Sequence, residues 1–294
     1  MPFGEPTTDT TAANFGRAAR YGRPMDDLPI CVTCGVQYPA DHDTAHCPIC
    51  EDDRQYVGHN GQEWTTLGSL RTERSNRFGE EVYGLTGIGT TPRFAIGQRA
   101  LLVPGEGGNL LWDCVSLIDD ETVDKVTDLG GIAAIAISHP HYYSSMIEWS
   151  EAFGGVPVYI HDSDRPWVQR NGNVVFWEGD RQEILPGRTL LNPRIHFAGG
   201  SIVHWADGAQ GRGALCTGDI FQVVSDRRWL SFMYSYPNYI PEHPDTVRRS
   251  LQLVEPFDFD VIYGAWWDMV VEQDAKAALT RSARRYLEHL GMQL

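Results

Sequence analysis

Short apolar runs separated by glycine and proline turns make up most of the chain after residue 90. The run "IAAIAIS" at 132–138 is continuously apolar, which predicts a strand buried on both faces. Segments 93–104 and 109–117 flank the turn "GEGG" and predict two neighbouring strands. Longer segments of mixed polarity predict helices at 119–129, 144–154, 241–257 and 272–290.

The predicted elements fall into two halves, and in each half strands are followed by helices. This order is typical of the α/β class, as a four-layer αβ/βα sandwich of helix, sheet, sheet and helix. Residues 1–28 are polar and rich in glycine, proline and threonine, which predicts a flexible N-terminal arm. The sequence therefore predicts three parts: this arm, a cysteine-rich module over 29–60 and a main domain over 61–294.

Four of the six cysteines form two Cys-x-x-Cys pairs in the segment "CVTCGVQYPADHDTAHCPIC". Cys31 and Cys34 make the first pair, and Cys47 and Cys50 make the second. A gap of two residues lets both thiolates of a pair reach one ion, and two such pairs suit a tetrahedral zinc site. We expect a zinc-ribbon-like module whose zinc is structural, because four thiolates leave no open position for chemistry.

The net charge of −15 and the pI near 5.0 argue against nucleic acid or an anionic membrane surface as a partner. The chain contains no run of 18 apolar residues and starts without an apolar signal region. The expected location is therefore the cytoplasm, where paired cysteines are more often metal ligands than disulfides. The sequence leaves the oligomeric state open, with a homodimer among the options.

Three separate apolar segments end in residues that bind metals. His139 and His141 follow the apolar run in "AISHPH", His196 lies in "RIHFAGGSIVHW", and Asp219 ends "ALCTGD". Two or three imidazoles with a carboxylate hold a divalent ion well. We therefore expect these four side chains to meet at one edge of the sandwich.

The order and context of these segments resemble the metallo-β-lactamase superfamily, which includes glyoxalase II, lactonases and persulfide dioxygenases. Its motif His-x-His-x-Asp-His is matched by His139 and His141, but Tyr143 stands in the place of the Asp and Ser144 in that of the last His. The segments "IHFAGGS" and "TGD" resemble two further motifs of the superfamily, and "VIYGAWW" resembles its last one, with Ala265 or Trp266 where a His is expected. The likeness covers roughly residues 90–270.

The resemblance implies one metal position rather than two. The ligands of the first position, His139, His141, His196 and Asp219, are all present, whereas the three that complete the second are replaced. His161 and Asp268 are the remaining candidates to complete it. The segment 229–241, "WLSFMYSYPNYIP", is dense in aromatic residues and is expected to cover the mouth of the site.

The leading hypothesis is a metal-dependent hydrolase of a small molecule, with one zinc held by three His and an Asp. Asp219 and Tyr143 are the candidate catalytic residues, Tyr143 either as a hydrogen-bond or proton donor or as a residue that fills the space of the second ion. The first alternative is a mononuclear iron oxygenase that uses His139, His196 and Asp219, as the likeness to persulfide dioxygenases implies. The second is a non-catalytic protein with a structural ribbon.

Overall fold

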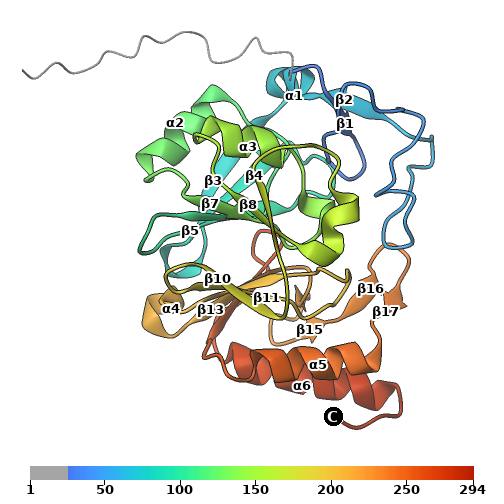
Figure 1. Ribbon diagram of the computed structural model, residues 1–294. Helices are drawn as coiled ribbons and strands as arrows, with labels where there is room; N and C mark the ends of the chain where they lie inside the picture. The colour runs from blue at the N-terminus through green and yellow to red at the C-terminus, as the bar shows by residue number, and fades with distance from the viewer. Residues whose placement is uncertain (1–25) are drawn as a thin grey trace, which may run out of the picture.

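The computed structural model describes residues 26–294, so the predicted N-terminal arm lies almost wholly outside the described residues. Two β-sheets lie face to face in the centre of the molecule (Figure 1). The first has the strand order β3-β4-β5-β6-β7-β8-β9 and the second β10-β11-β12-β13-β18-β19. The strands of the first sheet are β3 (Ser75–Glu80), β4 (Thr86–Thr91), β5 (Arg99–Val103), β6 (Leu110–Trp112), β7 (Ala134–Ala136), β8 (Val158–His161) and β9 (Val174–Trp177).

The second sheet is built from the C-terminal half of the chain. Its strands are β10 (Arg181–Leu185), β11 (Arg188–Leu191), β12 (Ile202–Trp205), β13 (Ala214–Gly218), β18 (Val261–Gly264) and β19 (Val270–Val271). Short pairs are formed by β1 (Pro29–Cys31) with β2 (Trp64–Thr66), β14 (Gln222–Val223) with β15 (Leu230–Ser231), and β16 (Met233–Ser235) with β17 (Ile240–Pro241).

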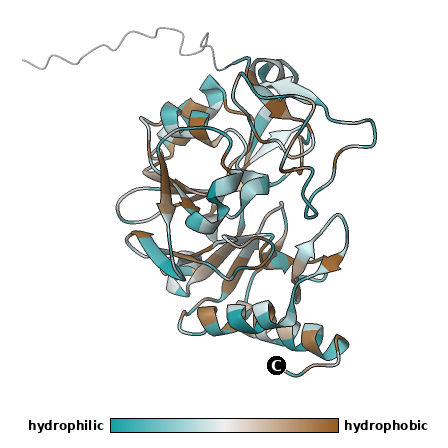
Figure 2. Cartoon of the chain, turned by 45° about the vertical axis from the view of Figure 1, so that its right-hand side comes forward, coloured by the Kyte–Doolittle hydropathy of each residue, from teal (hydrophilic) through white to brown (hydrophobic). Residues whose placement is uncertain are grey.

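Helices cover the outer faces of both sheets, which confirms the predicted four-layer arrangement (Figure 1). The first sheet carries α2 and α3, and the second carries α5 and α6, whose polar sides face solvent (Figure 2). The α-helices are α1 (Leu67–Glu73), α2 (Asp120–Asp128), α3 (Met146–Ala152), α4 (Gly208–Gly211), α5 (Pro244–Val254) and α6 (Ala275–His289). The 3₁₀-helices are η1 (Val82–Gly84), η2 (Pro140–Tyr142) and η3 (Asp162–Trp167).

Local sequence accounts for where the helices begin and end. The Asp119 carboxylate accepts a hydrogen bond from the Thr122 backbone N–H and caps α2, which is followed by Gly130 and Gly131 with positive φ. Pro244 opens α5, where a missing N–H costs nothing. Apolar residues of α5 and α6 then face a core shared with the second sheet.

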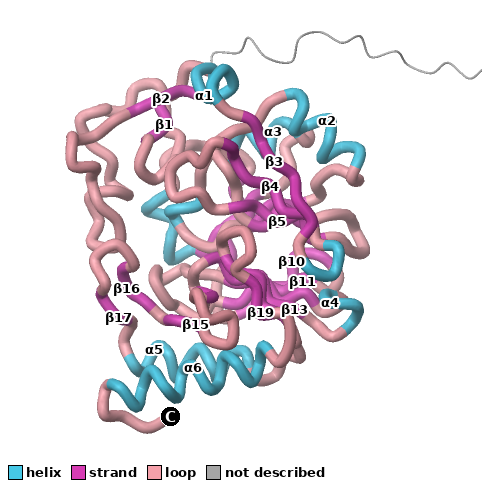
Figure 3. The backbone as a smooth tube through the Cα atoms, turned by 180° about the vertical axis from the view of Figure 1, so that it is seen from behind, coloured by secondary structure: helices cyan, strands magenta, loops and turns pink. Residues whose placement is uncertain are grey.

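The cysteine-rich module packs directly on the first half of the domain. Its buried Ile30, Val36 and Tyr38 share one apolar cluster with residues of α2, α3 and the first sheet. The module is closed by β2, which lies beyond the predicted end of the module at residue 60 and pairs with β1. From β1 and β2, its loops descend beside β16 and β17 of the second half (Figures 1 and 3).

Trp267 links the chain after β18 to the first sheet. Its ring lies against Gly79, Gly87 and Gly89, three glycines of β3 and β4. A Cβ atom at any of the three would come within 2.8 Å of the indole, so only glycine leaves room for it. The guanidinium carbon of Arg77 lies 4.3 Å from the centre of the same indole.

Parallel pairing sets the position of the candidate site. The strands β6, β7 and β8 are parallel neighbours, so their carboxyl ends lie at one edge of the first sheet. In the second sheet β13 and β18 are also parallel neighbours. The chain segments that carry the candidate ligands follow β7 and β13 or lie between β11 and β12.

Candidate metal centre

Three buried imidazoles meet between the two sheets. The ligand nitrogens of His139, His141 and His196 all lie within 4.8 Å of one another. His139 precedes the single turn of η2 and His141 lies within it, so the turn points both rings the same way. His196 comes from the loop between β11 and β12. The structure thus brings together the three predicted histidines, although their binding of a metal stays a prediction.

The distances between the nitrogens suit a divalent ion. His141 Nδ1 lies 3.2 Å from His196 Nε2. Two nitrogens bound tetrahedrally to zinc at 2.0–2.1 Å are about 3.3 Å apart. In the absence of an ion the two nitrogens would share one proton, whereas an ion would accept both lone pairs.

Hydrogen bonds outside the centre fix the orientation of two of the rings. His196 Nδ1 donates to the backbone carbonyl of Tyr234 at 2.6 Å, so its lone pair is on Nε2, toward the centre. His139 Nδ1 lies 2.9 Å from Ser138 Oγ, which likewise leaves Nε2 for an ion. The Ser138 backbone N–H donates to Asp113 Oδ1 at 2.8 Å, so Asp113 supports this side of the centre.

The loop that carries His196 has a strained backbone. His196 has a φ of 67°, a region that non-glycine residues seldom adopt. Its N–H donates to Glu242 Oε2 at 2.9 Å, which helps to hold this conformation. A Cβ atom at Gly200 would lie 2.3 Å from the Ile195 carbonyl oxygen, so the tight turn requires glycine there. Strain of this kind is concentrated at functional sites.

Several buried polar atoms around the three rings have no hydrogen-bond partner. Three of them are His139 Nε2, Tyr142 Oη and Asp219 Oδ1; the fourth, His141 Nε2, cannot bind the same ion as His141 Nδ1. Asp219 Oδ1 lies 3.5 Å from His139 Nε2, so the carboxylate lies beside one of the three rings, outside the group of ligand atoms that all lie within 4.8 Å of one another. Buried atoms of this kind are rare in folded proteins, and a bound ion or water is a usual explanation. The set of donors fits one divalent cation.

Burial controls the charge of these groups. It lowers the pKa of His139 and His141 well below the usual histidine value, and that of His196 to about 4. The rings are therefore neutral at pH 7, as metal ligands must be. Burial also raises the pKa of Asp219 to about 7, and the Tyr142 hydroxyl opposes this in part. Asp219 can thus gain or lose a proton near neutral pH.

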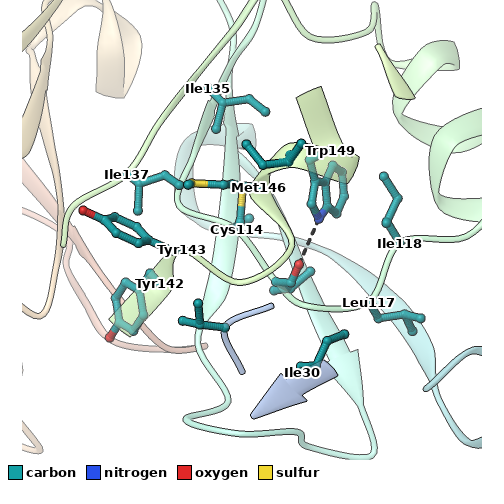
Figure 4. Packing of buried hydrophobic residues seen from close by; sticks show 14 of the residues in the cluster. Ile30, Cys114, Leu117, Ile118, Ile135, Ile137, Tyr142, Tyr143, Met146 and Trp149 are labelled. Atoms are coloured by element: carbon teal, nitrogen blue, oxygen red, sulfur yellow. Dashed lines mark hydrogen bonds between the residues drawn. The ribbon is translucent and has the colours of Figure 1, made fainter. Parts of the chain in front are cut away.

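The tyrosine at the centre is Tyr142 rather than Tyr143. The Tyr142 ring centroid lies 4.4 Å from that of His139, and burial together with the charge of Asp219 raises the pKa of its hydroxyl. The Tyr143 hydroxyl instead donates to the Asp164 backbone carbonyl at 3.3 Å. The rings of both tyrosines belong to the apolar cluster that also contains Ile137 and Met146, so the hydroxyl contacts are what distinguish them (Figure 4). Both tyrosines stand in the same short turn, so the sequence offered no signal to choose between them.

The residues considered for a second metal position lie elsewhere. Ser144 Oγ donates to the Cys114 carbonyl, and Ala265 is buried without a donor side chain. His161 Nδ1 accepts from the Ser163 backbone N–H and its Nε2 donates to the Gly179 carbonyl, and Asp268 is exposed to solvent. Within residues 26–294, the four cysteines are the one other group of three or more His, Cys, Asp or Glu side chains close enough together to hold an ion.

The four cysteines form a separate cluster. Cys31 Sγ lies 3.6 Å from Cys50 Sγ, and Cys34 Sγ lies 3.7 Å from Cys47 Sγ. These distances exclude disulfides, whose sulfurs are about 2.05 Å apart, and suit zinc, because Zn–S bonds of about 2.3 Å place tetrahedral sulfurs about 3.8 Å apart. Tyr38 Oη and Gln62 Nε2 lie 3.1 Å and 3.0 Å from two of the sulfurs, as hydrogen bonds to thiolates would require.

The sequence is similar to YmaE, an uncharacterized protein of Bacillus subtilis (strain 168), with 46% identity over 269 residues. That alignment covers 90% of this chain and 97% of YmaE. The chain belongs to the YmaE family. No family model matches the sequence.

Solved structures show the fold of this YmaE relative. The metallo-β-lactamase VMB-1 superposes with a TM-score of 0.54 at 12% identity, over 74% of this chain and 98% of that one. DIM-1 metallo-β-lactamase superposes with a TM-score of 0.53 at 12% identity, over 71% of this chain and 95% of that one. FIM-1 from Pseudomonas aeruginosa, in a mono-zinc form, superposes with a TM-score of 0.51 at 11% identity, over 72% of this chain and 96% of that one. The expected metallo-β-lactamase fold is confirmed, and at this identity the likeness concerns the fold alone.

Among the helices of residues 26–294, none is both long enough and apolar enough to cross a bilayer.

Proposed function

We propose that this YmaE relative is a metal-dependent hydrolase of a small molecule, with one ion held by His139, His141, His196 and Asp219. The observation that carries the proposal is the convergence of three neutral, buried imidazoles beside a buried carboxylate with an unpartnered oxygen. A divalent ion in such a site supplies a Lewis acid that polarises a carbonyl group and acidifies water.

The protein's own residues supply the proton chemistry. In the metal-free centre burial raises the pKa of Asp219 to about 7, so Asp219 would give up its proton when its carboxylate binds the ion. Tyr142 keeps its proton, because burial raises the pKa of its hydroxyl well above the usual value. It is therefore a hydrogen-bond donor beside Asp219, suited to an oxygen on which negative charge develops.

The surroundings of the centre favour a substrate with an apolar part. Phe197 packs against all three histidines, with ring centroids 4.9–5.5 Å away. Tyr236 lies 5.5 Å from the His196 ring and Trp167 lies 5.8 Å from Phe197. Tyr234 and Tyr236 belong to the aromatic segment 229–241, in agreement with its expected place beside the site.

A second candidate rests on the position of Asp219. With its Oδ1 3.5 Å from His139 Nε2, it could join His139 and His196 as a set of two His and one carboxylate. That set is typical of mononuclear iron enzymes that use oxygen. The identity of the metal separates this candidate from the hydrolase.

Metal analysis of protein purified without added metal tests both candidates. We expect two ions per chain, of which one is lost in His196→Ala and the other is retained. Zinc in the histidine-dependent position, with hydrolysis of an ester, lactone or amide in a substrate panel, supports the hydrolase. Iron in that position supports the oxygenase. A single ion that is unaffected by His196→Ala would contradict the proposal and leave a non-catalytic protein with a metal-binding module.

A further inference from the structure

One residue of the cysteine-rich module lies against the three-histidine centre. Arg54 Nη1 donates to the backbone carbonyl of His196 at 3.4 Å. The guanidinium carbon lies 3.9 Å from the centre of the Phe197 ring, and 5.3 Å and 5.5 Å from those of Trp167 and Tyr234. The module, which is built around another metal cluster, thus contacts the loop that carries His196.

The four-cysteine cluster sets the position of Arg54. The second cysteine pair ends at Cys50, and Asp52 follows two residues later. Asp52 accepts from Arg54 Nε at 2.5 Å, Nη2 at 2.8 Å and the backbone N–H at 3.0 Å. This bidentate pairing leaves the planar guanidinium little freedom.

The module is attached to both halves of the main domain. On the first half, the Gln37 backbone N–H donates to the Ser144 carbonyl at 3.0 Å, and Ser116 Oγ donates to the Gly35 carbonyl at 2.6 Å. On the second half, Asn238 Nδ2 donates to the backbone carbonyls of Asp53 at 2.8 Å and Gln55 at 3.2 Å. Figure 3 shows the loops of the module running past both halves.

The histidine centre depends on the spacing of the same two halves. His139 and His141 belong to the first half, whereas His196 and Asp219 belong to the second. We propose that the four-cysteine module holds the His196 loop in register with the other ligands through Arg54 and Asn238, so that the two metal sites are energetically coupled. This proposal rests on the proposed function, since it requires an ion in the histidine centre. Arg54 is a positioning residue here.

A charge-balanced double variant tests the coupling. Asp52→Asn with Arg54→Gln removes one negative and one positive charge. Arg54 is the charge that acts on all three histidines, and losing a cation there would by itself strengthen the binding of a divalent ion, so weaker binding reports lost positioning. Asp226→Asn with Arg228→Gln is the matched control, because Asp226 accepts from Arg228 Nε, Nη2 and backbone N–H in the same pattern on an exposed loop. Cobalt(II) distinguishes the sites, since only the thiolate site gives a sulfur-to-metal charge-transfer band.

We expect the Asp52/Arg54 variant to bind the ion of the histidine centre about 10- to 100-fold more weakly, the range for changes in the surroundings of metal ligands. The thiolate band, the circular dichroism spectrum and the affinity of the control should remain those of wild type. If the double variant fails to fold, Asn238→Ala should show a weaker loss in the same direction, because Asn238 is exposed and makes the same attachment from the other side.

The outcomes separate this proposal from the function on which it rests. If wild type binds two ions and both variants keep its affinity at the histidine centre, the coupling is refuted while the proposed function stands. If wild type binds only the thiolate-bound ion, the proposed function fails and the coupling fails with it.

Discussion

The two ligand clusters of this protein differ in how completely they could surround an ion. The four cysteines can supply a full tetrahedron of sulfurs; all four are buried, and two of them, Cys31 and Cys47, lie beside hydrogen-bond donors. The histidine centre offers three nitrogens and one carboxylate with an unpartnered oxygen, beside a phenol that has no hydrogen-bond partner. A closed set of four ligands suits a structural ion, whereas a set with spare polar groups suits an ion that takes part in a reaction.

The largest effect is expected from removing one ligand of the four-cysteine cluster. Cys47→Ser should remove one metal ion per chain, because one of four ligands is lost and the rest of the module has no other tetrahedral set. Structural zinc contributes folding free energy directly, and losing even a few kcal/mol lowers the melting temperature of a domain of this size by roughly 10 °C. Metal analysis and thermal unfolding measure both effects. An unchanged metal content would contradict the assignment of the cluster.

Loss of a ligand from the three-histidine centre should lower the activity more than the stability of the protein. We expect His196→Ala to lower the rate of the proposed reaction at least about a hundredfold, since removing a ligand costs more than altering its surroundings. The thiolate-bound ion and the melting temperature of the module should be retained. A preparation that keeps both the second ion and the activity would exclude His196 as a ligand.

Two adjacent tyrosines, Tyr142 and Tyr143, provide a matched pair of variants that tests which hydroxyl acts at the three-histidine centre. Tyr142→Phe removes the hydroxyl beside Asp219, and we expect a rate about a hundredfold lower, the lower end for a positioned proton donor. Tyr143→Phe removes only the bond to the Asp164 carbonyl, so its effect should be limited to about 1 kcal/mol of stability. Rate constants at constant metal content measure the difference. The reverse result would place Tyr143 in the reaction.

The smallest effect concerns the pH dependence of metal binding. Because burial raises the pKa of Asp219 to about 7, this carboxyl is protonated in the metal-free centre below pH 7, and an ion must displace the proton. Affinity should therefore fall by up to about tenfold per pH unit between pH 7 and 5, where the histidines with their lowered pKa values add little. Asp219→Asn should weaken binding and flatten this slope, as competition titrations would show. A slope that persists in Asp219→Asn would exclude Asp219 as the titrating ligand.

The ligand residues could be predicted from the sequence because metal chemistry restricts their types and spacing. The pairs at Cys31–Cys34 and Cys47–Cys50 and the pair His139–His141 are local patterns, and the apolar runs before His139 and Asp219 fixed the strand ends that carry them. The four-layer order of strands and helices followed from the same runs.

The contacts made by folding could not be predicted in this way. Arg54 meets the carbonyl of His196 across 142 positions of sequence, and no local pattern marks it. The choice between Tyr142 and Tyr143 depends on the direction in which one short turn presents its side chains. Both depend on tertiary packing, and no local spacing of residues in the sequence indicates them.

The indole of Trp267 and the glycines beneath it limit how this chain can evolve. Gly79, Gly87 and Gly89 leave the space that the ring occupies, and each would clash with it if it gained a side chain. A mutation at any of the four positions is therefore penalised unless the others have already changed. The segment after β18 is thus tied to β3 and β4 through one side chain, so substitutions at these four positions are expected to depend on one another.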